Sequence, residues 1–78
     1  METKIEVIKY LRQYYNGNTE ALDYIYPLCR LDRESLSYYC DKCVAEIKSA
    51  TSAAMSDDGA RNAKQRILGI YADKIIGV

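Results

Sequence analysis

The sequence predicts an all-α protein, a small four-helix domain built on a long antiparallel helical hairpin with two short helices before it. The first observation is a seam in which apolar or small residues recur three and four positions apart, as they do where helices pack. The residues of this seam are Leu36, Cys40, Cys43, Ile47, Ala50 and Ala54. The second is a similar helical pattern over residues 60–75, and the third is the turn-forming string Ser-Asp-Asp-Gly at residues 56–59 between the two patterns. At 78 residues the whole chain, 1–78, is expected to be one domain.

The first short helix is expected at about residues 4–15. Thr3 and Glu6 match a capping box, and Gly17 supplies a left-handed stop after Asn16. Its apolar face is broader than one neighbouring helix needs, and it is formed by Val7, Ile8, Leu11, Tyr14 and Tyr15. We therefore expect a homo-oligomer with this helix at the interface.

A second short helix is expected from Glu20 onward, capped by Asn18 or Thr19. Pro27 removes a backbone donor and disfavours helix in the residue before it, so this helix should end or kink near Tyr26.

The two long helices have clearer limits. Asp32 is a good N-cap for a helix over residues 33–55, and the last helix should begin after Asp57 or Asp58 and end near Ile76. The residues of the last helix expected to face inward are Ala60, Ala63, Ile67, Ile70, Tyr71 and Ile75, with Leu68 beside them. Ile76 is expected on the outer face, where it needs cover from the first helix or from another chain.

Charge and composition limit the classes of function. Lysines and arginines balance aspartates and glutamates at 11 each, so no overall field attracts nucleic acid or an anionic membrane. No apolar run is long enough to span a membrane and the first residues do not resemble a signal peptide, so we expect a cytoplasmic protein with no membrane contact. The absence of histidine removes the commonest general base and metal ligand. We found no catalytic motif, and we expect neither enzyme activity nor a cofactor.

Tyrosine is the only aromatic residue, present eight times without phenylalanine or tryptophan. A ring that packs and a hydroxyl that needs a partner suit half-buried positions and interfaces. Tyr10 and Tyr14 lie toward one margin of the first helix, and Tyr38 points away from the helix-packing seam. We therefore interpret Tyr10, Tyr14 and Tyr38 as candidate contacts for a protein partner, against the plainer interpretation that they pack or are singly exposed.

Cysteine supplies one motif-like string, Cys40-Asp41-Lys42-Cys43. A redox C-x-x-C is activated at a helix N-terminus, whereas this one lies about two turns inside the expected helix. With Cys29 it offers at most three zinc ligands and lacks the second pair of a structural site. Packing in the seam is the main interpretation, no metal site is expected, and a metal or redox module is the weaker alternative.

Three basic residues near the start of the last helix, Arg61, Lys64 and Arg66, form the other candidate site. A helix N-terminus favours anions, so these residues can hold a phosphate while a tyrosine stacks on a base. The plainer interpretation is that Asp57 and Asp58 neutralise them locally.

The leading hypothesis is a non-enzymatic interaction protein, a small adaptor, regulator or inhibitor that presents a Tyr-rich helical surface to a protein partner. Small size without catalytic groups is also typical of the inhibitors that phages and mobile elements encode, so a viral source is a hypothesis from size alone. The alternative is an oligomer that binds nucleotides or nucleic acid.

Overall fold

The computed structural model describes residues 2–77, and its regular elements are all helical. Its elements, in chain order, are α1 (Glu2–Tyr15), α2 (Ala21–Ile25), the 3-10 turn η1 (Tyr26–Leu28), α3 (Arg33–Ala53) and α4 (Asp57–Ile76). No strand occurs in residues 2–77, so the predicted all-α class with four helices is confirmed.

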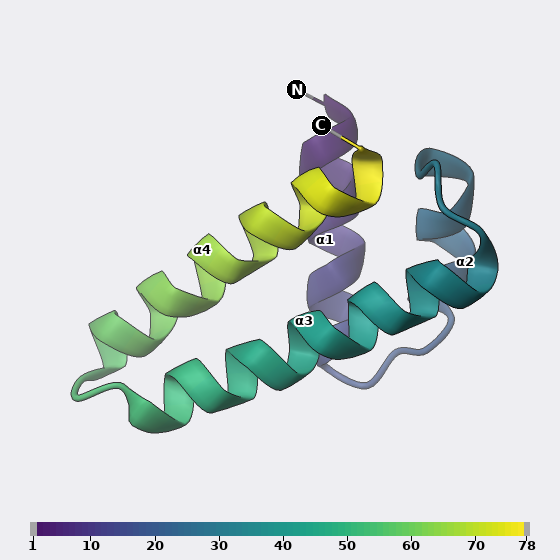
Figure 1. The fold of residues 1–78 in the computed structure, drawn as a ribbon. Helices are drawn as coiled ribbons and strands as arrows, with labels where there is room; N and C mark the ends of the chain where they lie inside the picture. The colour runs from purple at the N-terminus through teal and green to yellow at the C-terminus, as the bar shows by residue number, and fades with distance from the viewer. Residues whose placement is uncertain (1, 78) are drawn as a thin grey trace.

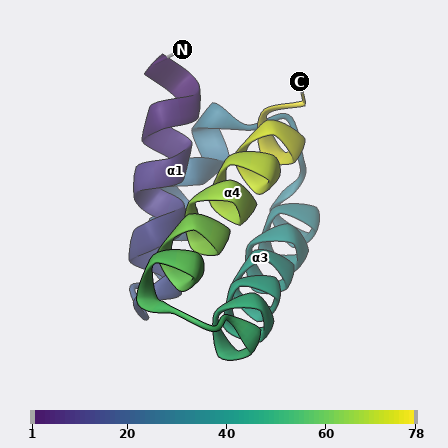
Figure 2. The same ribbon diagram turned by 90° about the vertical axis from the view of Figure 1, so that its left-hand side faces the viewer.

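The helices form two layers. In Figure 1, α3 and α4 lie side by side at the front, and α1 and α2 lie behind them; Figure 2 shows the same two layers from the side. α4 packs against both α3 and α1, and α1 packs against α2. An ion pair of 3.0 Å between Lys4 on α1 and Asp73 on α4 marks the contact of these two helices. α4 is therefore the helix that joins the two layers.

The core lies where the two layers meet. Each of the four α-helices contributes apolar side chains to this cluster, which consists of Val7, Leu11, Ile25, Leu36, Cys40, Cys43, Ile47, Ile67, Leu68, Tyr71, Ala72 and Ile75. The predicted seam of α3 is buried at its first four positions, Leu36, Cys40, Cys43 and Ile47. Removing these apolar surfaces from water is the main stabilising contribution in so small a chain.

The ends of the long helices follow from their capping groups. The Asp32 carboxylate accepts a hydrogen bond of 2.7 Å from the Ser35 backbone N–H, which confirms the predicted start of α3 and holds the pKa of Asp32 below its usual value. At α4 the cap is Ser56, whose Oγ accepts from the Gly59 N–H at 3.0 Å. The connection is thus residues 54–56, and the prediction of a turn over residues 56–59 is wrong.

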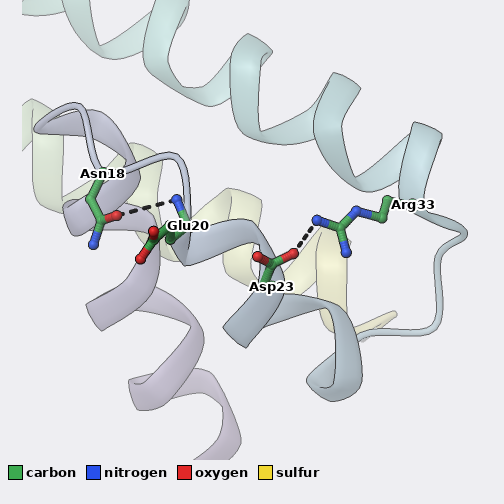
Figure 3. Close-up of polar contacts among 4 residues, drawn as sticks. All are labelled: Asn18, Glu20, Asp23 and Arg33. Carbon is green, nitrogen blue, oxygen red and sulfur yellow. Dashed lines mark hydrogen bonds and ion pairs between the residues drawn. The ribbon is translucent and has the colours of Figure 1, made fainter.

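The short helices differ in detail from their predicted limits. α1 already includes Glu2, so Thr3 lies inside the helix and the predicted capping box is wrong. Before α2, Asn18 Oδ1 accepts a 3.2 Å hydrogen bond from the Glu20 backbone N–H, a local turn that delays the helix to Ala21 (Figure 3). Pro27 lies in the 3-10 turn that follows α2, so the predicted end of this helix near Tyr26 is confirmed.

The inner face of α4 is rotated from the expected one. Ile70 is 44% exposed, so its predicted inward position is wrong, whereas Leu68 and Ala72 are fully buried. The reason is that α4 contacts α1 as well as α3, which turns its buried stripe toward α1. Ile76 is half-buried against the core. The chain itself therefore covers part of Ile76, so this residue does not require a second chain.

Among the described residues, no helix has both the length and the apolar character that a membrane span requires.

Candidate functional site

Tyr14 links the two layers. Its hydroxyl donates a hydrogen bond to the Asp41 carboxylate on α3. Burial, followed by this carboxylate, raises the pKa of Tyr14 to about 12, so the phenol keeps its proton at neutral pH. One of the three predicted partner contacts is therefore held within the chain.

Tyr10 also has a partner in its own chain. Its ring stacks on that of Tyr24, with centroids 5.2 Å apart and planes inclined by 14°. The Lys9 ammonium lies 5.4 Å from the Tyr10 centroid. This stack joins α1 to α2 and leaves Tyr10 half-buried.

Tyr38 differs from both because 59% of its surface is exposed. Its ring meets that of Tyr39 edge to face at 5.5 Å, and the Lys42 ammonium lies 5.7 Å from its centroid. Tyr39 in turn is 6.5 Å from the ring of the buried Tyr71. Tyr38 is therefore an exposed ring that is connected to the core by successive aromatic contacts through Tyr39 and Tyr71.

A hollow of about 410 Å³ lies beside this ring. It is lined by Tyr38, Tyr39, Ser35, Asp32 and Glu34, and we call it the Tyr38 hollow. All five residues belong to α3 or its N-cap, so one rigid element positions them. The sequence identified Tyr38 but missed the rest, although successive steps of three or four residues lead from Asp32 to Ser35 and from Ser35 to Tyr38 and Tyr39, which was a usable signal.

Two further exposed tyrosines were missed from the sequence. Tyr24 is 54% exposed and Tyr26 is 42% exposed. The Arg33 guanidinium lies 5.8 Å from the Tyr26 centroid and bonds to the Asp23 carboxylate (Figure 3). These contacts fix the start of α3 against α2 and η1. No local sequence pattern predicts these contacts, since they depend on how the chain folds back after Pro27.

The three basic residues of α4 do not meet at one site. Arg61 pairs with Asp58 at 3.6 Å, within its own helix. Lys64 lies over the ring of Tyr15 on α1, 4.5 Å from its centroid. Arg66 lines the groove between α3 and α4. The three cationic side chains therefore lie in different surroundings, which is unfavourable for binding a single phosphate.

The cysteines of the C-x-x-C string are core residues. Cys40 and Cys43 are almost fully buried, and burial raises the pKa of each thiol to about 12. Cys29 is half-buried, and its thiol donates to the Tyr26 carbonyl oxygen at 3.2 Å. Within residues 2–77 no three Cys, Asp or Glu side chains are placed to hold a metal ion. A reactive thiolate is disfavoured at both buried positions.

We expect Cys40 and Cys43 to resist thiol reagents while the protein is folded. With pKa values of about 12, only about one thiol in ten thousand is ionised at pH 8, and the thiolate is the reactive form. A colorimetric thiol assay should titrate at most Cys29 in the native protein and all three cysteines in denaturant. Rapid reaction of two or three thiols in the folded protein would instead support the redox interpretation.

Comparison of this chain with protein-family models, with curated proteins and with solved structures found no match.

Proposed function

We propose that this chain is a non-enzymatic interaction protein, a small adaptor, regulator or inhibitor that binds a protein partner through tyrosines on its helical surface. Its framework is the long antiparallel hairpin of α3 and α4, backed by the two shorter N-terminal helices. The observation that carries the proposal is Tyr38, an exposed ring beside a hollow on a rigid helix. Aromatic side chains fixed in this way are the usual anchors of protein interfaces.

The supporting contacts explain why Tyr38 suits this role better than the other two predicted tyrosines. Tyr14 is bonded to Asp41 and Tyr10 is stacked on Tyr24, so binding through either would break a contact within the chain. Tyr39 already restricts the ring of Tyr38, so less rotamer freedom is lost when a partner covers it. Tyr24 and Tyr26 are further exposed rings on the same chain.

The polar rim of the hollow is consistent with a protein interface. Asp32 already accepts the capping hydrogen bond of α3, and Glu34 is exposed. Lys42, which lies over the Tyr38 ring, is also exposed. Exposed charges around an apolar centre contribute little energy and restrict which partners fit. We propose a cytoplasmic location as part of this function, because the three cysteines are free thiols, as is usual in a reducing compartment.

Affinity capture tests the proposal. The immobilised chain is incubated with a cell extract, and the Tyr38→Ala chain serves as the paired variant. We expect a protein that the unmodified chain enriches and the variant does not. A second control, Arg61→Glu with Lys64→Glu, should retain that protein because neither residue contacts the Tyr38 hollow.

Two results would contradict the proposal. One is enrichment of nucleotides or nucleic acid that the charge reversal abolishes and Tyr38→Ala does not. The other is a captured protein that binds the Tyr38→Ala chain as tightly as the unmodified one.

A further inference from the structure

A second surface, separate from the Tyr38 hollow, lies between the two long helices. It is a groove of about 430 Å³ lined only by residues of α3 and α4. Its floor is apolar, with Ala50 and Ala53 on the α3 side and Ile67 and Ile70 on the α4 side. α1 and α2 lie in the other layer (Figure 1), and Ile70 is 44% exposed. α3 and α4 thus pack on the second layer through one face and keep an apolar strip on another.

The charges along this groove are segregated by helix. Glu46 lies on the α3 wall, whereas Arg66 and Lys74 lie on the α4 wall. Among residues 2–77, none of the three is within 4.0 Å of an opposite charge. Lys74 instead lies over the ring of Tyr71, 5.0 Å from its centroid. The groove therefore presents one acidic and one basic edge.

Two copies of this groove can pair with opposite charges facing each other in one symmetric arrangement. If a twofold axis runs along the helix pair, α3 of each chain faces the antiparallel α4 of the other. Glu46 then meets the basic edge of the second chain, and Ile70 meets its small residues Ala50 and Ala53. If the axis instead runs across the pair, α4 faces α4 in reverse and Arg66 approaches a second Lys74, which is repulsive.

We propose that this groove is the interface of a symmetric homodimer, with the twofold axis along the α3–α4 pair, so that α3 of each chain packs on α4 of the other. Each chain would gain a third layer over the exposed apolar strip, which matters because a chain of 78 residues buries a small share of its surface alone. This dimer does not depend on the proposed function, since Tyr38 does not line the groove.

The proposal is tested with purified chains by sedimentation equilibrium. We expect the unmodified chain to be a dimer of twice its 8.9 kDa at tens of micromolar. Glu46→Lys should raise the dimer dissociation constant by about tenfold or more, because it places a cation against the basic edge at two symmetric positions. Lys48→Glu is the matched control, since Lys48 is exposed on α3 and does not line the groove.

Mixing two variants tests whether the charged edges of the groove meet across the interface. A chain with Glu46→Lys and a chain with both Arg66→Glu and Lys74→Glu should each be monomeric alone. Together they should form a one-to-one dimer, because both contacts regain opposite charges. Circular dichroism should show each variant as helical as the unmodified chain, since all three positions are exposed.

A monomer for the unmodified chain at these concentrations would overturn the proposal. So would a Glu46→Lys chain that dimerises as well as the Lys48→Glu control. Failure of the two folded charge variants to associate when mixed would overturn the proposed contact between Glu46 and the basic edge.

Discussion

Leu68→Ala is expected to remove about 2 to 5 kcal/mol from the free energy of unfolding, because it leaves a cavity in a fully packed core. Leu68 is completely buried on α4, the helix that joins the two layers. A domain of this size has a total free energy of unfolding of roughly 4 to 12 kcal/mol, so this single change should bring the protein close to unfolding at physiological temperature. Urea denaturation followed by circular dichroism measures the difference.

Ile70→Ala is the matched control for this prediction, because it lies two residues away on the same helix and is partly exposed. With both changes measured in a Glu46→Lys background, where dimer formation does not contribute, Ile70→Ala should cost less than about 1.5 kcal/mol. If Ile70→Ala proved as destabilising as Leu68→Ala, the inner face of α4 would be the one expected from the sequence, and the rotation of its buried stripe toward α1 would be wrong.

Tyr38→Ala is expected to weaken binding of the captured protein by about 30-fold or more, which corresponds to about 2 kcal/mol for loss of a central aromatic anchor. The exposed ring makes few contacts within its own chain, so the variant should remain folded. Isothermal titration calorimetry with the purified partner gives the dissociation constant directly.

Tyr14→Phe controls for indirect effects on the fold. It retains the ring and removes the hydroxyl that donates to Asp41, so it should lower stability by about 1 kcal/mol and leave the dissociation constant unchanged. Equal affinities for the Tyr38→Ala and unmodified chains would show that Tyr38 is not an anchor.

The parts of the fold that could be predicted from the sequence are those that local chemistry determines. The N-cap at Asp32 needs only its own backbone neighbours, and the three- and four-residue spacing of Cys40, Cys43 and Ile47 identifies a buried face wherever the partner helix lies. The error at Ile70 has a different origin. Periodicity shows that α4 has an apolar stripe, but the direction of that stripe depends on α1 packing beside it.

The candidate sites show the same division. The outward direction of Tyr38 follows from its angle to the seam, and its exposed fraction agrees with that prediction. The separation of Arg61, Lys64 and Arg66 could not be predicted, because Lys64 turns toward Tyr15, which is far from it in the sequence. Likewise, the bond from Tyr14 to Asp41 joins two helices whose relative rotation no local pattern defines.

The central claim is that an aromatic anchor on α3 binds a protein, and the salt dependence of that binding tests it most directly. The dissociation constant of the complex should be measured between 50 and 200 mM salt. An interface centred on Tyr38 should weaken by less than about threefold over this range, because exposed rim charges contribute little. A ligand held by phosphate contacts to Arg61, Lys64 and Arg66 should weaken about 20- to 40-fold, because three counterions are released on binding. A loss of that size would contradict the account.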